Sequence, residues 1–137
     1  MDEYLVLHGS ATLGGLKTAS LFTYPYTSRS ELERMVEQWN QTLNVKGVYL
    51  FIMRCSQRRA LIYLCRISRL ERDLQAGEVQ AFLHEAGYRA FTVPYCIGRL
   101  RQRLQSEPGF PHEIGLFLGY PLADVKGFIE HKGQNYK

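Results

Sequence analysis

Two apolar segments separated by a short polar stretch constrain the fold of this chain most strongly. Residues 48–54 and 60–66 are rich in aliphatic and aromatic side chains, and the polar residues 55–59 lie between them. This pattern predicts an antiparallel hairpin, and pairing Val48 with Arg66 sets its register. In that register both faces of the hairpin are apolar. We therefore expect the hairpin to lie centrally in a sheet that is covered on both sides, or at a subunit contact.

The segments around the hairpin predict helices and two further strands. Apolar residues recur at helical spacing after Ser30, where Ser30 and Glu33 have the spacing of a capping box, and Gly47 is placed to end that helix. Pro94 is placed to open another helix that ends near Ser106. Additional elements are expected as a helix at 78–86 and strands at 18–24 and 89–93. The sequence thus predicts an α+β fold with a small, mainly antiparallel sheet packed by several helices.

The length of the chain fits one domain, 1–137, with a single core. Its apolar runs fall far short of the roughly 20 residues that cross a membrane, and the acidic residues 1–3 differ from the basic start of a signal peptide. Cys55, Cys65 and Cys96 lack CxxC spacing, which indicates neither a disulfide framework nor a self-contained zinc site. We therefore expect a cytoplasmic protein with reduced thiols and no metal.

Arginine is concentrated in the middle of this basic chain. The net charge is +4, and residues 54–103 contain ten arginines against four acidic residues. Such a surface would attract a small anionic ligand or an acidic partner protein, because the guanidinium fork matches planar anions. The alternative is a solvated face whose arginines form ion pairs within the protein. Nucleic acid is not expected, since no recognised binding motif accompanies the charge.

The segment 110–128, FPHEIGLFLGYPLADVKGF, combines two helix starts with three glycines and a His–Glu pair. Proline is favoured in the first turn of a helix, so Pro111 and Pro121 predict two short helices, 111–119 and 121–131. The free N–H groups at such helix starts can bind an anion. Alternatively, the apolar residues pack the two helices down and the glycines allow close approach.

His112 and Glu113 are the main candidates for chemistry in that segment. Adjacent residues lie about 100° apart on a helix, so the pair does not suit one metal ion unaided. A histidine pKa near neutrality suits acid–base catalysis by His112, with Glu113 or Asp124 as the orienting carboxylate. Lys17 follows two glycines and could stabilise an anion, although its surroundings do not match a Walker motif. The alternative for His112 is a structural hydrogen bond to the backbone or to Glu113.

Tyrosines and one cysteine supply further candidates. The chain has nine tyrosines, and aromatic phenols such as those of Tyr24, Tyr26 and Tyr120 near basic groups suit a planar cofactor or a protein interface. A buried tyrosine with one hydrogen-bonded hydroxyl is the commoner alternative. Cys55 lies beside Arg54 and has the surroundings most suited to a lowered thiol pKa.

Two segments resemble a known family. LGGLKTASLF at 13–22 and HEIGLFLGYPLADVKGFI at 112–129 resemble domain-of-unknown-function family 3793, small proteins of anaerobic bacteria. That family has no established activity, so the resemblance implies suspect residues and not a reaction. Similar chains have a proline within residues 10–13 and continue beyond Lys137 with an aromatic tail, so a site that used the tail would be incomplete here. The residues that the resemblance implicates are Lys17, His112, Glu113, Gly115, Gly119, Tyr120, Pro121, Asp124, Val125, Gly127 and Phe128.

The leading hypothesis from the sequence is a non-catalytic or accessory module. It would bind a small anionic or planar cofactor, or an acidic partner protein, in a cleft formed by Lys17, His112, Glu113, Tyr120 and Asp124. One alternative is a small enzyme in which His112 is the acid–base group and Lys17 stabilises developing negative charge. A further alternative is a structural homodimer built on the two-sided apolar hairpin.

Overall fold

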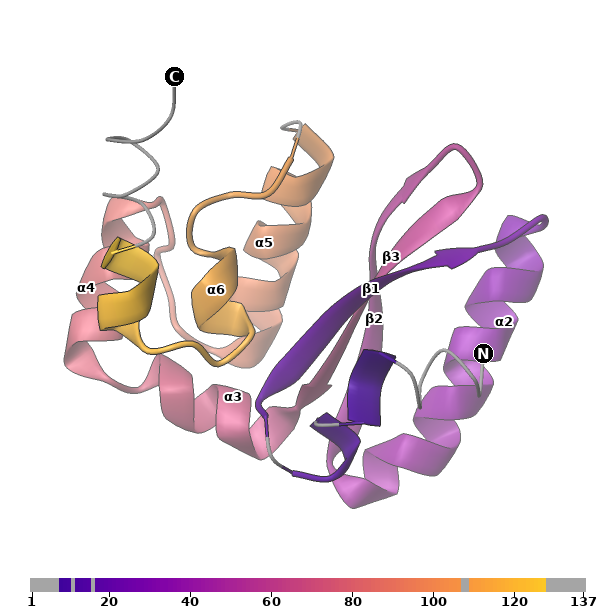
Figure 1. The fold of residues 1–137 in the computed structure, drawn as a ribbon, viewed down its shortest axis with the longest axis horizontal. Coiled ribbons are helices and arrows are strands. Elements are labelled where there is room, and N and C mark those ends of the chain that lie inside the picture. The colour runs from indigo at the N-terminus through magenta and orange to yellow at the C-terminus, as the bar shows by residue number, and fades with distance from the viewer. Residues whose placement is uncertain (1–7, 11, 16, 107–108, 128–137) are drawn as a thin grey trace. The chain divides into compact units, whose positions relative to one another are not determined.

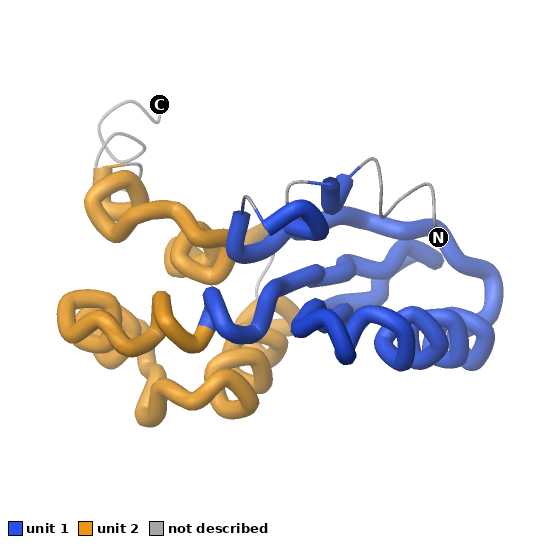
Figure 2. The backbone as a smooth tube through the Cα atoms, turned by 90° about the horizontal axis from the view of Figure 1, so that it is seen from below, with its two compact units in different colours: residues 1–70 blue, residues 71–137 orange. Residues whose placement is uncertain are grey.

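The computed structural model describes residues 8–10, 12–15, 17–106 and 109–127. It confirms the α+β class: a three-stranded antiparallel sheet is combined with several helices (Figure 1). The chain forms two compact units, which Figure 2 distinguishes by colour. Unit 1 is Met1–Leu70 and unit 2 is Glu71–Lys137. In the part of the chain that the structure describes, no helix has the length and apolarity to cross a membrane.

The sheet of unit 1 has the strand order β1-β3-β2. Strand β1 is Ala19–Pro25, β2 is Val48–Ser56 and β3 is Arg59–Arg66, and both neighbouring pairs are antiparallel (Figure 1). The hairpin of β2 and β3 has the predicted register, with Val48 opposite Arg66. Only β3 is central in the sheet, because β1 pairs with β3 and leaves β2 at an edge.

Two details of the hairpin differ from the sequence prediction. The polar loop is shorter than expected: a turn at Gln57 and Arg58 joins the strands, and both residues have positive φ, 52° and 61°. Two-residue turns of this kind usually carry Asn-Gly or another glycine pair, and this turn has neither. The second detail is a bulge, since Ile52 pairs with Ile62 but Arg54 already pairs with Leu61. The bulge moves Cys55 onto the face of Ile52, where both pack against the core of unit 1.

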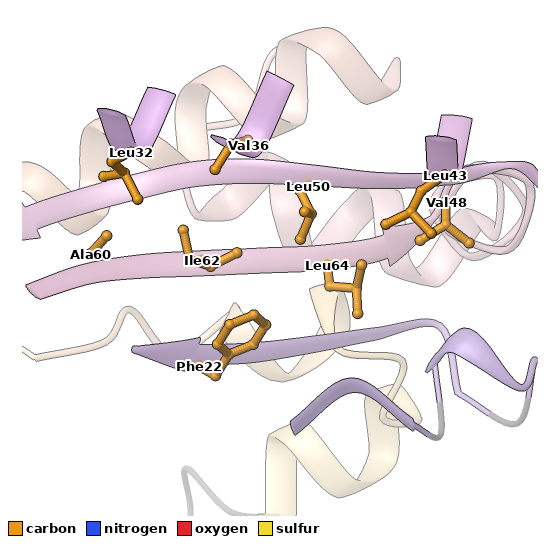
Figure 3. Packing of buried hydrophobic residues seen from close by; sticks show 9 residues of the cluster. All are labelled: Phe22, Leu32, Val36, Leu43, Val48, Leu50, Ala60, Ile62 and Leu64. Atoms are coloured by element: carbon orange, nitrogen blue, oxygen red, sulfur yellow. The ribbon is translucent and has the colours of Figure 1, made fainter. Parts of the chain in front are cut away.

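Helix α2 (Arg29–Leu43) and one face of the sheet form the core of unit 1. The helix contributes buried residues at helical spacing, and the strands contribute every second residue. Trp39 packs partly buried against this core. The nine buried residues, shown in Figure 3, are Phe22, Leu32, Val36, Leu43, Val48, Leu50, Ala60, Ile62 and Leu64.

The start of α2 corrects the predicted capping box. Ser28, not Ser30, is the N-cap: its backbone is extended and its side chain accepts a hydrogen bond from the Glu31 amide at 3.4 Å. Both Ser28 and Ser30 have a glutamate three residues later, so the sequence offers two overlapping boxes, and the earlier serine is the one that caps the helix. At the other end, the short 3-10 helix η1 (Asn44–Lys46) leads to Gly47, whose φ of 80° ends the element as predicted.

Asn40 on α2 also protects the outer edge of β2. Its side-chain amide donates to the Leu50 carbonyl at 3.0 Å, and its oxygen accepts from the Leu50 amide at 2.8 Å. These two bonds occupy backbone groups that an edge strand would otherwise offer to another strand. The side chain therefore blocks pairing with a second chain at this point of the edge.

Unit 2 consists mainly of helices. Helix α3 (Ile67–Leu74), which the sequence analysis did not predict, crosses the boundary between the units. The predicted strand at 89–93 is wrong: Thr92 instead caps α5, accepting through its hydroxyl from the Tyr95 amide and through its carbonyl from the Cys96 amide. The first C-terminal helix is also shorter than predicted. The helices of this unit after α3 are α4 (Gly77–Glu85), α5 (Val93–Ser106), α6 (Ile114–Phe117) and residues 122–127, and the predicted continuation to 131 lies outside the described residues.

Candidate functional site

A buried carboxylate organises unit 2. The Glu113 side chain is fully buried, and the Arg103 guanidinium holds it with Nε 2.5 Å from Oε2 and Nη2 3.2 Å from Oε1. The Tyr88 hydroxyl donates a third hydrogen bond to Oε2 at 3.0 Å. Buried charges are tolerated when they are paired and hydrogen-bonded, and Glu113 meets both conditions. We call Tyr88, Arg103 and Glu113 the carboxylate cluster.

Three separate elements bring the carboxylate cluster together. Arg103 lies in the last turn of α5 and Glu113 is the residue that precedes α6. Tyr88 is placed by the end of α4, where Gly87 has a φ of 101° and the Tyr88 amide donates to the Leu83 carbonyl. Burial, followed by the neighbouring Glu113 charge, raises the pKa of the Tyr88 phenol far above its ordinary value, so Tyr88 remains a donor.

His112 lies at the outer side of the carboxylate cluster. Its side chain is 50% exposed, and its Nε2 is 3.9 Å from Glu113 Oε1, which is beyond hydrogen-bond distance. The ring meets Phe82 edge to face, with 5.7 Å between the ring centroids. Because Glu113 is bonded to Arg103 and Tyr88, its charge is already compensated. The geometry gives His112 a nearby carboxylate without a bond that would orient the imidazole for proton transfer.

The five residues of the predicted cleft fall in different units. His112, Glu113, Tyr120 and Asp124 belong to unit 2, and Lys17 belongs to unit 1. The structure brings the side chains of His112 and Glu113 near each other, whereas those of Tyr120 and Asp124 are exposed. The amides of the latter two donate to backbone carbonyls of the same segment, that of Tyr120 to Gly115 and that of Asp124 to Pro121. Within residues 8–10, 12–15, 17–106 and 109–127, no group of three or more His, Cys, Asp or Glu side chains could hold a metal ion.

The glycine loop before Lys17 is occupied by contacts within unit 1. The Gly14 amide donates to the Ser10 carbonyl at 2.9 Å and the Gly15 amide to the Thr12 carbonyl at 3.1 Å. Two arginines bind the carbonyls of the same stretch: Arg66 donates to Thr12 and Leu13, and Arg69 donates to Gly15. These contacts satisfy the end of the helical turn at residues 12–13. The two glycine amides are therefore not directed at an anion.

The arginine-rich middle is largely used inside the protein. At least seven of its ten arginines interact within the protein: five have named partners, and Arg54 and Arg101 make further interactions. This arrangement supports the intramolecular alternative over a broad anion-binding surface. The five are Arg66, Arg69, Arg72, Arg99 and Arg103.

A pocket of about 300 Å³ in unit 1 is lined by residues from the end of β1, the start of α2 and the segment between them. Figure 1 shows these two elements. The aromatic walls of the pocket are fixed by neighbouring contacts: the Tyr24 hydroxyl donates to Met35 Sδ at 3.6 Å, and the Tyr26 amide donates to the Arg58 carbonyl at 2.9 Å. We call it the β1–α2 pocket. The described residues that line it are Tyr24, Pro25, Tyr26, Thr27, Glu31, Leu32 and Met35.

Sequence reasoning identified the tyrosines of the β1–α2 pocket but missed the pocket itself. Tyr24 and Tyr26 stood out as aromatic candidates, whereas Met35 and Glu31 were given no role in a site. The available signal was the Tyr-Pro-Tyr sequence next to a helix N-cap. It gives the order of the residues and not the space between them.

Cys55 adjoins the β1–α2 pocket through Tyr26. A hydrogen bond with Cys55 is the main cause that raises the pKa of the Tyr26 phenol. Cys55 is half-buried, whereas Cys65 and Cys96 are buried. Burial raises the pKa of the Cys65 thiol to about 12 and that of the Cys96 thiol to about 11. Of the three thiols, Cys55 is therefore the one that a reagent in solution can reach.

A family model described as "Protein of unknown function (DUF3793)" matches residues 5–137. The chain belongs to this family. A search of curated proteins and a search of solved structures each found no match. The DUF3793 description assigns no activity, so the function has to be inferred from the geometry of the two units.

Two glycines of the C-terminal DUF3793 segment have structural reasons to be glycine. A side chain on Gly115 would meet Val125 Cγ2 at 3.0 Å and the Tyr120 ring at 3.6 Å. Gly119 has a φ of 95°, which residues with a side chain rarely adopt. These positions support a packing role for much of the segment that suggested the family. Phe128 lies outside the described residues.

Proposed function

We propose that this DUF3793 protein is a non-catalytic binding module and that its ligand is a small planar molecule held in the β1–α2 pocket. The observation that carries the proposal is the pocket lining, in which Tyr24, Tyr26 and Met35 surround a space of about 300 Å³. Small-molecule sites are concave, have apolar and aromatic walls, and start at about this volume. Tyrosine rings and a methionine sulfur offer stacking and sulfur–aromatic contacts to a flat ligand.

The state of Glu113 favours binding over catalysis. An acid–base pair would need a carboxylate that orients His112, and Glu113 instead binds Arg103 and Tyr88. A compensated, buried carboxylate lends little basicity to an imidazole that lies 3.9 Å away. The residues of the predicted enzyme thus serve the stability of unit 2 in this proposal. Three free cysteines suit a reducing compartment, so we also propose a cytoplasmic location.

The test of this function is a titration with benzyl alcohol, a neutral planar probe, followed through the NMR methyl signal of Met35. Binding in the β1–α2 pocket should shift that signal and leave Met53, which is buried in β2, unchanged. Tyr26→Ala should weaken binding roughly three- to tenfold, because one aromatic contact is lost. Tyr120→Ala removes an exposed tyrosine of unit 2 and is the matched control. A Met35 signal that does not move at any soluble probe concentration would overturn the proposal.

An acidic partner protein is a second candidate function. Arg58 and Arg59 are both exposed at the turn between β2 and β3, and the Arg58 carbonyl binds the amide of Tyr26. An exposed arginine pair beside the pocket would attract an acidic surface. Association through these residues should weaken as salt is raised, and Arg58→Gln with Arg59→Gln should abolish that salt dependence. If the affinity of a partner changes neither with salt nor with the two substitutions, this candidate function is wrong.

A further inference from the structure

The charges around the β1–α2 pocket decide which planar ligand fits. Among the described residues that line it, Glu31 carries the only formal charge, and no lysine or arginine is in the lining. An anionic ligand would therefore meet a carboxylate with no cation in the lining itself, and Arg29, whose charge acts on Tyr26, is already paired with Glu33. We infer that the pocket takes a small organic cation of the arylammonium or alkylammonium class. This inference rests on the proposed function, because it names the ligand class of the same site.

Glu31 differs from its neighbour Glu33 in a way that supports a cationic ligand. Glu33 forms an ion pair with Arg29 at 3.2 Å, whereas the described residues give no cation partner to the Glu31 carboxylate. Both glutamates are exposed and lie in the first turns of α2. Glu31 thus leaves its negative charge available at the mouth of the pocket.

The walls of the pocket are suited to the same ligand. An ammonium group is attracted to the face of a tyrosine ring, and two or more rings around one cation form the usual recognition site for alkylated ammonium ions. Tyr24 is held by its bond to Met35, and Tyr26 by its amide bond to Arg58 and its side-chain bond to Cys55. The two rings therefore do not have to be ordered by the ligand, which lowers the entropic cost of binding.

The start of α2 is the competing influence, because a helix N-terminus favours anions. Here part of that end is already satisfied from within the chain. The Ser28 side chain accepts from the Glu31 amide, and the Ser28 carbonyl accepts from the Leu32 amide. The Glu31 side chain itself supplies the negative charge that the helix start favours. Among the residues that line the pocket the balance of formal charge is therefore negative, and Arg58 and Arg59 lie outside that lining.

Three probes of similar shape test the inference: benzylammonium, benzyl alcohol and benzoate, which differ in charge. Each is titrated at pH 7 into the full chain, with the Met35 methyl signal as the measure of binding. The rate of Cys55 alkylation by iodoacetamide gives a second measure, since an occupied pocket should slow it while the buried Cys65 and Cys96 stay unreactive. We expect benzylammonium to bind about five- to tenfold more tightly than benzyl alcohol, and benzoate to bind most weakly.

Two variants make the test specific. Glu31→Gln should bring the affinities for benzylammonium and benzyl alcohol to within about twofold of each other. The preference that remains comes from the attraction of the ammonium group to the tyrosine rings. Glu33→Gln, which removes an equally exposed charge of the same helix, should leave the ratio unchanged. Equal affinities in the unaltered protein, or tightest binding of benzoate, would overturn the cationic ligand and leave the β1–α2 pocket as a binding site. Binding of none of the three probes would overturn both the ligand class and the proposed function.

Discussion

The carboxylate cluster of unit 2 and the β1–α2 pocket of unit 1 differ in how their carboxylates are used. Glu113 is buried and bonded to two partners, whereas Glu31 is exposed and lines a pocket without a cation among the described residues. A charge that the fold has compensated contributes to stability and has little left to offer a ligand. A charge that the fold has left open contributes little to stability. This difference distinguishes a structural site from a candidate binding site. Substitutions in either site test whether the distinction holds.

The largest effect is expected from Glu113→Gln. The substitution leaves the Arg103 guanidinium facing a neutral amide, and breaking a buried ion pair in this way costs about 3–5 kcal/mol of unfolding free energy. Urea unfolding followed by circular dichroism measures the loss. Arg103→Met with Glu113→Leu replaces the pair by apolar residues and should recover much of the stability. A loss below about 1 kcal/mol in the single variant would show that Glu113 is not structural and would reopen a catalytic role.

The next largest effect is an alkaline loss of stability that comes from Cys65 in β3. Its pKa rises from 9.0 to about 12 on folding, so above pH 9 the unfolded chain loses the thiol proton while the folded chain keeps it. The unfolded state then binds fewer protons, and stability falls as pH rises from 9 towards 12, by up to about 1.4 kcal/mol per pH unit.

Replacing Cys65 separates its share of the alkaline loss from that of other groups. Cys65→Val should remove the share of Cys65 from the slope between pH 9 and 11, measured as the urea midpoint at each pH, and leave the share of Cys96, whose pKa also rises on burial. Cys55→Ser changes the half-buried thiol beside the pocket and should leave the slope as it is. If the unaltered protein and both variants have the same slope, the Cys65 thiol ionises in the folded chain as easily as in the unfolded chain. The interior of the sheet would then be as accessible to solvent as the β1–α2 pocket, contrary to the proposed difference between the two.

How much of this could be predicted depends on how local each feature is. The β2–β3 register and helix α5 follow from alternation and helical spacing within single segments, so the sequence predicted both. The bulge in β2 and the turn at Gln57 and Arg58 depend on how two strands meet, and no glycine marks that turn. These features were therefore missed although the strands themselves were found.

The two sites were harder to predict than the fold for a related reason. Glu113 binds Tyr88 and Arg103, which lie 25 and 10 residues away in the chain, and no local pattern connects them. His112 and Glu113 drew attention because they are adjacent in a family segment, and adjacency says nothing about burial. The β1–α2 pocket likewise depends on the distance between a strand end and a helix start. Sequence reasoning could name its tyrosines and not the space that they enclose.

Two tyrosine hydroxyls give a smaller and more direct test of the contrast. Tyr88→Phe removes a buried donor to a carboxylate and should cost about 1–3 kcal/mol. Tyr24→Phe removes a hydroxyl that donates to the weak acceptor Met35 Sδ, and the loss of that bond should cost less than about 0.5 kcal/mol. Both values come from urea unfolding of the full chain. Equal costs would mean that the Tyr24 hydroxyl is as deeply committed to the fold as that of Tyr88, and the β1–α2 pocket would then be part of the core.

The smallest effect on stability should come from Glu31→Gln, although this change has the largest expected effect on the choice of ligand. The carboxylate is exposed and the favourable interaction with the start of α2 amounts to about 0.3–1 kcal/mol, which salt screens. Glu33→Gln should cost a similar amount, because an exposed pair with Arg29 at this spacing is worth about 0.3–0.5 kcal/mol. Urea unfolding at low and high salt compares the two. If Glu31→Gln instead raises stability, the negative charge of Glu31 destabilises the folded protein, as charges at binding sites often do. Glu31 would then differ from the stabilising Glu113 even more clearly. If it costs more than about 2 kcal/mol, Glu31 has a structural partner and cannot serve as the open charge of a ligand site.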